Sequence, residues 1–334
     1  MATGLALTLV LSVQGAPTTL PSAAAQTPPG VWAPAATTPA PPARLHAAVA
    51  YDPGTATTVL FGGRAGTELL GDTWTLSGST WTRRTPLANP PSLESASLAY
   101  DEASHQLVLF GGQGSTGPIA QTWAWDGVTW IPLAPAASPP ARYGAGLVYT
   151  GATHTLVLFG GLTAPTGALG DTWAWDGATW APMAAAMAPP ARGLAGFAPD
   201  SAHGTAVLFG GWSGSQSLGD TWTWDGTTWA QQHPAASPGA RQDAGMSGDP
   251  ALPGAVVFGG VAAGGAVAGD TWLWDGATWS QLPGPGGPPA RSGASVAYDA
   301  GARQLLLLGG TGSASGPALG DVWALKAATA PRAQ

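Results

Sequence analysis

Cysteine is absent from this 334-residue chain, and charged residues make up only 9% of it. Without a thiol the chain cannot form a disulfide, a zinc–thiolate site or a cysteine nucleophile. Basic residues are scarce: 11 Lys and Arg stand against 18 Asp and Glu, giving a net charge of −7. Nucleic acids and anionic membrane surfaces are bound by basic patches, so neither is an expected partner.

Glycine, proline and tryptophan are abundant, with 50, 32 and 17 residues respectively. So much Gly and Pro without a period would indicate disorder. Here the Trp residues and a hydrophobic content of 45% favour a packed protein with Gly and Pro in its turns. The length allows one large β domain or two ordinary domains, with a sizeable core in either case.

The N-terminus carries a short apolar run, Leu5 to Val13, followed by the small residues Ala23 to Ala25. This order resembles the core and cleavage region of a signal peptide. The run is shorter than the ~20 apolar residues that span a bilayer. No Lys or Arg precedes it, which is atypical, and a disordered leader is the alternative. We expect residues 1–26 to be a leader of this kind, and the protein to be extracytoplasmic, secreted or at the cell surface.

An internal repeat dominates the rest of the chain. A Gly-Gly pair follows an apolar run six times, at spacings of 49 or 50 residues. The pairs begin at Gly62, Gly111, Gly160, Gly210, Gly259 and Gly309. Each copy has four strand-like segments, termed a to d: one after Pro-Pro-Ala-Arg, one ending at Gly-Gly, one after Gly-Asp, and one after Asp-Gly. Four antiparallel strands repeated radially at this period predict a β-propeller.

Asp-Gly between segments c and d predicts a two-residue type I′ hairpin turn. In the third copy that turn would place Trp173 opposite Trp180, with Trp175 on the same side. The same Trp triple recurs in other copies. Its recurrence at fixed strand positions favours packing between blades over a ligand-stacking surface.

Gly-Gly after segment b, with a Trp about 20 residues later, resembles the Kelch motif, and the resemblance covers about residues 31–326. Six copies imply a six-bladed all-β propeller of four-stranded antiparallel blades, and the blades resemble the Kelch blades of the galactose oxidase central domain. We expect the propeller to span residues 27–326, with a short tail at 327–334. The second copy departs from the motif, with Leu93 in the Arg position and Ala120-Gln121 in place of Gly-Asp.

The last copy stops after segment c, whereas Val31 to Pro34 matches a segment d. We therefore expect residues 31–35 to complete the sixth blade and close the ring, which would remove two exposed sheet edges.

The repeat accounts for nearly every charged residue. Fourteen of 15 Asp recur in Gly-Asp, in the c–d turn or in the a–b turn, which leaves Asp243. Asp in such places serves turn geometry. Five Arg precede segment a, and we expect them to satisfy loop carbonyls or pair with the Gly-Asp carboxylates rather than form a carboxylate-binding ring. These are Arg44, Arg142, Arg192, Arg241 and Arg291.

His105, His154 and His203 recur in a–b turns on different blades, so a shared metal ion is not expected. No cofactor is expected either.

Variable loops mark the face on which the b–c and d–a connections emerge, because function sits where loops vary on a rigid scaffold. The candidate ligand-binding residues follow either the Gly-Gly pair or the segment-a Arg. They are His46, Arg64, Glu94, Gln113, Tyr143, Trp212, Gln242 and Asp243. The Kelch resemblance implies contacts to peptides or sugars at such positions. Trp212 and Tyr143 would suit a sugar, and Arg64 an anionic partner.

The sequence therefore predicts a monomeric module that binds a glycan or a protein, with a structural scaffold as the alternative. An enzyme is the least favoured reading, because His46, Glu94 and Asp243 fall on blades 1, 2 and 5 and nothing in the sequence positions them together. The copper-radical chemistry of galactose oxidase needs a Cys–Tyr cross-link, which this chain cannot form.

Overall fold

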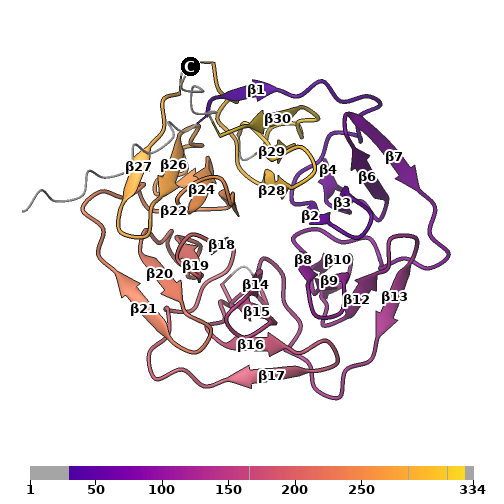
Figure 1. Ribbon diagram of the computed structural model, residues 1–334, viewed down its shortest axis with the longest axis horizontal. Helices are drawn as coiled ribbons and strands as arrows, with labels where there is room; N and C mark the ends of the chain where they lie inside the picture. The colour runs from indigo at the N-terminus through magenta and orange to yellow at the C-terminus, as the bar shows by residue number, and fades with distance from the viewer. Residues whose placement is uncertain (1–29, 165, 285, 314, 328–334) are drawn as a thin grey trace, which may run out of the picture.

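The computed structural model describes residues 30–327 except 165, 285 and 314, and its strands form six four-stranded antiparallel sheets around a central channel (Figure 1). This confirms the predicted six-bladed all-β propeller. Within the described part of the chain there is no helix, and so none that could span a membrane.

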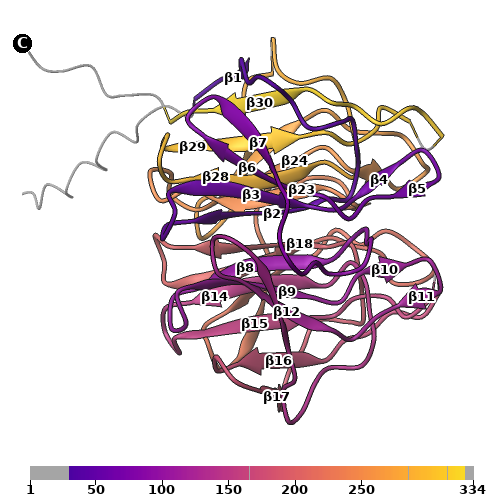
Figure 2. The same cartoon turned by 90° about the vertical axis from the view of Figure 1, so that its right-hand side faces the viewer.

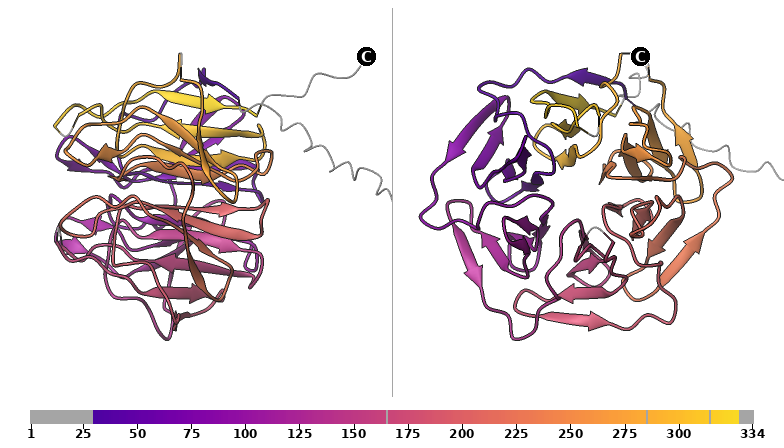
Figure 3. Two further views of the ribbon diagram at one scale, coloured as in Figure 1. Left: turned by 90° about the vertical axis from the view of Figure 1, so that its left-hand side faces the viewer. Right: turned by 180° about the vertical axis from the view of Figure 1, so that it is seen from behind.

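The strands of each blade run outward from the channel in the order a to d (Figures 1 and 3). Blade 1 consists of β2 (Ala48–Asp52), β3 (Thr57–Phe61), β6 (Thr73–Ser77) and β7 (Thr80–Arg84). Blade 2 consists of β8 (Ser97–Asp101), β9 (Gln106–Phe110), β12 (Thr122–Trp125) and β13 (Trp130–Leu133). Blade 3 consists of β14 (Gly146–Thr150), β15 (Thr155–Phe159), β16 (Thr172–Trp175) and β17 (Trp180–Met183). Blade 4 consists of β18 (Gly196–Asp200), β19 (Thr205–Phe209), β20 (Thr221–Trp224) and β21 (Trp229–Gln232). Blade 5 consists of β23 (Gly245–Gly248), β24 (Ala255–Phe258), β26 (Thr271–Trp274) and β27 (Trp279–Gln281). Blade 6 consists of β28 (Ser295–Asp299), β29 (Gln304–Leu308), β30 (Val322–Leu325) and β1 (Trp32–Pro34).

Short ribbons project from the face that carries the b–c loops, on the right in Figure 2. They are β4 (Arg64–Ala65) with β5 (Glu68–Leu69), β10 (Gln113–Gly114) with β11 (Gly117–Pro118), and β22 (Arg241–Gln242) with β25 (Val261–Ala262). The a–b and c–d turns form the opposite face.

The predicted two-residue c–d turn is wrong in blades 2 to 5. In blade 3 Trp175 pairs with Trp180 and Trp173 pairs with Pro182, which leaves a four-residue loop. The Asp176 carboxylate accepts hydrogen bonds from the amides of Ala178 and Thr179 at 2.9 and 2.8 Å. The Asp side chain thus caps a longer loop, as Asp does in turns. The predicted use of the Trp residues for packing is confirmed, because Trp175 and Trp180 are 1% exposed.

Side-chain hydrogen bonds join neighbouring blades through the outer strands. The indole Nε1 of each strand-d Trp donates to a strand-c Thr of the preceding blade, as Trp180 does to Thr122 at 3.0 Å. The same bond joins Trp130 to Thr73, Trp229 to Thr172, Trp279 to Thr221 and Trp32 to Thr271. Blade 1 is the exception: strand c of blade 6 carries Val322 at this position, and the buried Nε1 of Trp81 has no partner in the described structure.

The Gly-Gly pairs bring neighbouring blades together near the channel. The amide of the second Gly donates to the carbonyl that begins the next blade, as Gly112 does to Arg142 at 2.9 Å. A Cβ on the preceding residue, Gly111, would lie 2.5 Å from that carbonyl oxygen. Only glycine fits this approach, and its φ of 67° suits glycine as well.

The N-terminal strand closes the ring, as the sequence predicts. Strand β1 pairs with β30, with Trp32 opposite Leu325. Near the channel, the amide of Gly310 in blade 6 donates to the carbonyl of Arg44 in blade 1 at 2.9 Å. The predicted leader at 1–26 lies outside the described residues, as does all of the tail but Ala327, so these limits stay predictions.

Candidate functional site

The rim of the b–c/d–a face is built from six cross-strand pairs, one in each blade. In each pair the residue after the segment-a Arg position bridges to the residue after Gly-Gly. The pairs are Leu45 with Arg64, Glu94 with Gln113, Tyr143 with Leu162, Gly193 with Trp212, Gln242 with Val261, and Ser292 with Thr311. The two sets of variable positions that the sequence singles out are therefore adjacent in space, and six of the eight candidate residues lie in these pairs.

Inside the rim, backbone hydrogen bonds form a closed circle around the channel. One residue of each blade donates its amide to the carbonyl of the residue before it in the circle, at 2.8 to 3.1 Å. The six residues are His46, Ser95, Gly144, Leu194, Asp243 and Gly293, and we call this circle the neck. All six have a positive φ, between 53° and 63°.

The neck is narrow, because a hydrogen bond sets the distance between its members. Hydrogen-bonded neighbours have Cα atoms about 5.5 Å apart, so a six-membered ring of them has a radius of about the same size. Opposite Cα atoms of such a ring lie about 11 Å apart. The same six residues line the channel cavity at this end.

An ionic cluster lies on the neck. His46 Nδ1 is 3.0 Å from Glu94 Oε2, and His46 Nε2 is 3.0 Å from Asp243 Oδ2. Arg64 Nε donates to the same Glu94 oxygen at 2.9 Å. The expectation that nothing positions His46, Glu94 and Asp243 together is thus wrong. In the closed ring, the neck residues of blades 1 and 5 are near enough for their side chains to meet, and spacing along the chain does not reveal this.

The cluster balances its own charge. Burial of His46 disfavours protonation, but the charges and hydrogen bonds of Asp243 and Glu94 outweigh it and raise the pKa of His46 to about 10. Burial likewise opposes ionisation of Glu94, yet His46 and Arg64 hold the pKa of its carboxyl below the usual value. Two cations therefore face two anions, and both ring nitrogens of His46 are occupied.

Glycine makes the long reach of His46 possible. Gly293 of blade 6 lies between His46 and Asp243 in the neck. A Cβ there would lie 2.7 Å from His46 Nε2 and 3.3 Å from Asp243 Oδ2. The missing side chain leaves room for the ion pair to cross blade 6.

The five segment-a Arg residues have the structural role that the sequence predicts. Arg142 is fully buried and binds Asp171 of its own blade through two hydrogen bonds, at 2.6 and 2.8 Å. It also donates to the carbonyls of Gly160 and Pro140. Trp173 Nε1 donates to the second oxygen of Asp171 at 2.6 Å. The same bidentate ion pair joins Arg44 to Asp72, Arg192 to Asp220, Arg241 to Asp270 and Arg291 to Asp321.

The a–b turn histidines each bind a partner in their own blade. His105 Nδ1 lies 3.4 Å from the Tyr100 hydroxyl, and His154 Nδ1 lies 3.1 Å from the Tyr149 hydroxyl. His203 contacts Asp200. In the described part of the chain no group of three or more His, Asp or Glu side chains could hold a metal ion.

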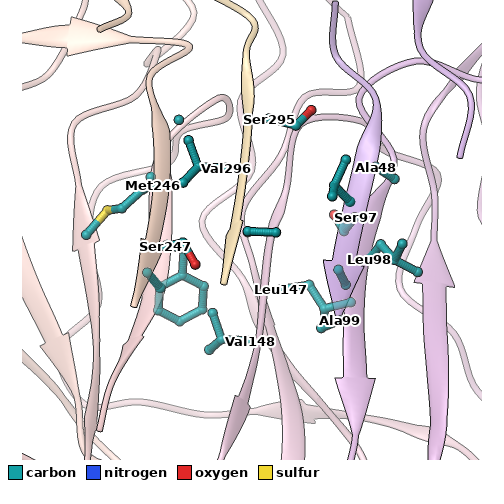
Figure 4. Close-up of a pocket in the computed structure, with 18 of the residues that line it drawn as sticks. Ala48, Ser97, Leu98, Ala99, Leu147, Val148, Met246, Ser247, Ser295 and Val296 are labelled. Carbon is teal, nitrogen blue, oxygen red and sulfur yellow. The ribbon is translucent and has the colours of Figure 1, made fainter. Parts of the chain in front are cut away.

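Below the neck the channel is a cavity of about 570 Å³, lined by the six innermost strands. Figure 4 shows part of its lining, in which Leu147, Met246 and Val296 lie with Ser97, Ser247 and Ser295. The hydroxyls of Ser97 and Ser295 donate to the carbonyls of the next blade, at 2.8 and 2.6 Å. These bonds occupy the hydroxyl hydrogens of Ser97 and Ser295.

Comparison with known proteins shows the fold and nothing finer. No protein-family model matches the chain, and no curated protein matches it. Among solved structures it is similar to that described as "Structure of YjhT", with a TM-score of 0.66 and 15% sequence identity, over 85% of this chain and 95% of the other. At this identity the likeness establishes that both chains share the propeller architecture.

Proposed function

We propose that the chain is a binding module of the Kelch type that recognises a glycan or a protein through the rim of its b–c/d–a face. The observation that carries the proposal is the rim itself. Six adjacent pairs of residues differ from blade to blade, on a scaffold whose other positions repeat. Variation confined to one face of a rigid frame is typical of recognition surfaces.

The chemistry of the rim suits a polar ligand with hydrophobic faces. Tyr143 and Trp212 are half-buried on neighbouring blades 3 and 4. Aromatic rings of this kind bind through their faces while their polar atoms form hydrogen bonds. Gln113 and Gln242 supply amide groups on blades 2 and 5. Together with the leader-like N-terminus, this favours a secreted or surface module without a resident cofactor.

The cluster on the neck supports binding rather than acid–base catalysis. A general acid or base works best when its pKa lies near the operating pH. The pKa of His46 is raised to about 10, and both of its ring nitrogens already contact carboxylates. His46 therefore has no free nitrogen to offer a substrate.

A glycan array probed with the chain from residue 27 onward tests this proposal, followed by titration of any hit by Trp fluorescence. Binding should saturate and should be lost in Trp212→Ala and Tyr143→Ala. Val128→Ser is the matched control, because Val128 is 75% exposed in a c–d turn on the opposite face. If no glycan binds, pull-down from a cell-surface fraction distinguishes a protein partner from a scaffold. Any partner captured equally by wild type and by both rim variants contradicts recognition through the rim.

A further inference from the structure

The channel cavity extends from the neck to the a–b/c–d face. At one end its lining includes the neck residues, among them His46 and Asp243. At the other end its lining includes Tyr51, Tyr100, Tyr149 and Tyr298. A five-residue innermost strand spans about 16 Å, so the tyrosines lie at the end of the cavity near the a–b/c–d face, and we call this end the socket.

The four tyrosines occupy one register position. Each is the fourth residue of its innermost strand, and each pairs with the second residue of the next strand, as Tyr100 does with Leu107. The others pair as Tyr51 with Thr58, Tyr149 with Leu156 and Tyr298 with Leu305. Blades 4 and 5 carry Pro199 and Gly248 at this position. The aromatic rings therefore form a crescent over blades 6, 1, 2 and 3.

Negative charge gathers on this face. Ten carboxylates lie in or next to its turns. Five beside the a–b turns are buried: Asp52, Asp101, Asp200, Asp249 and Asp299. The other five are exposed or half-buried: Glu102, Asp126, Asp176, Asp225 and Asp275. Two described Lys or Arg residues accompany them, Arg303 in an a–b turn and Lys326 after β30. Burial, Asp249 and Asp299 raise the pKa of Tyr298, and Arg303 opposes them. The other three tyrosines of the crescent are Tyr51, Tyr100 and Tyr149. Burial raises the pKa of each of these three phenols, and neighbouring carboxylates raise it further.

We propose that this tyrosine-lined socket binds an organic monocation with an apolar tail, such as an alkylammonium ion. A cation is attracted to aromatic faces and to the surrounding carboxylates. The tail enters the apolar band formed by Val49, Leu98, Leu147, Phe197, Met246 and Val296. This site is separate from the rim and does not depend on the function proposed for it.

Isothermal titration with hexyltrimethylammonium tests the site, with hexanol and hexanoate as neutral and anionic probes of the same tail length. The cation should bind saturably and more tightly than either probe, and binding should weaken in 0.5 M salt. Equal binding of the three probes, or no binding of the cation, would overturn the proposal.

Substitutions in the crescent separate an aromatic effect from a loss of folding. Tyr100→Leu should weaken cation binding roughly threefold to tenfold, the size of one cation–π contact, whereas Tyr100→Phe should retain most of it. Tyr143→Leu on the rim should leave cation binding unchanged. Thermal unfolding checks that each variant folds. Equal losses in Tyr100→Leu and Tyr100→Phe would show that the aromatic face does not bind the cation.

Discussion

His46 Nε2 lies 3.0 Å from Asp243 Oδ2, although 197 residues separate them in the chain and a third blade separates them in the ring. The neck makes this possible, since its backbone hydrogen bonds hold the two residues at neighbouring points of a small circle. The pair therefore links blade 1 to blade 5 directly, beyond the contacts between adjacent blades.

The raised pKa of His46 predicts a loss of stability at alkaline pH. Its folded pKa of about 10 exceeds the ordinary 6.5. The stabilisation is thus fully present below pH 6.5 and disappears as the pH rises toward 10. Chemical unfolding from pH 6 to 10 should show the free energy of unfolding falling more steeply for wild type than for His46→Gln. The His46 ring resonance in NMR should titrate near pH 10, and a midpoint near 6.5 would contradict the cluster.

Replacing Gly293 should break the ion pair. In Gly293→Ala the new Cβ meets the His46 ring, so we expect a loss of about 3 kcal/mol in unfolding free energy, the size typical of a disrupted buried pair. Gly66→Ala is the matched control: Gly66 has a similar φ of 60° but no atom within 4 Å of the added Cβ. It should cost only about 1 kcal/mol. Equal losses in the two variants would show that backbone strain alone explains the effect.

The unpaired Trp81 indole predicts a stabilising substitution. Val322→Thr supplies the hydroxyl that the other five blade junctions have, and it should raise the free energy of unfolding by up to about 1 kcal/mol. Thr122→Val removes the equivalent bond to Trp180 and should lower stability by a similar amount. Denaturant unfolding measures both. A destabilised Val322→Thr protein would mean that the hydroxyl finds no acceptable geometry beside Trp81.

The natural departure in blade 2 predicts how the Arg–Asp pairs behave. Blade 2 has Leu93 and Gln121 in their place, and Gln121 still accepts the Trp123 indole hydrogen bond at 3.0 Å. Asp171→Gln alone should cost about 3 kcal/mol, because it leaves the buried Arg142 cation unpaired. Adding Arg142→Leu should recover part of that loss. A double-mutant cycle by denaturant unfolding measures the coupling, and simple additivity would argue against it.

Ring closure predicts that the N-terminal strand is essential. Deleting residues 27–36 removes β1 and exposes the edge of β30, so the protein should unfold or aggregate. Trp32→Ala is the milder test and should cost about 3–5 kcal/mol, because it removes a buried ring. Deleting residues 2–26 is the control. If the 27–36 deletion melts like that control, β1 does not close the ring.

The sequence by itself determined the blade count, the closing strand, the role of the periodic Arg residues and the packing role of the Trp residues. These follow from a repeat of about 49 residues, because each copy places the same residue types at the same positions and so forms the same local hydrogen bonds. The c–d register could not be derived in this way, since Asp-Gly suits both a two-residue turn and the four-residue loop that the Asp side chain caps.

Only the tertiary structure decided which residues meet at the neck. Sequence spacing places His46, Glu94 and Asp243 on different blades. It does not say how close to the channel axis these residues lie, and therefore how far apart they are. Six backbone hydrogen bonds set that radius, and Gly293 leaves the space that the His46–Asp243 pair fills. Contacts across a closed ring depend on its diameter, and the diameter exists only once all six blades have packed.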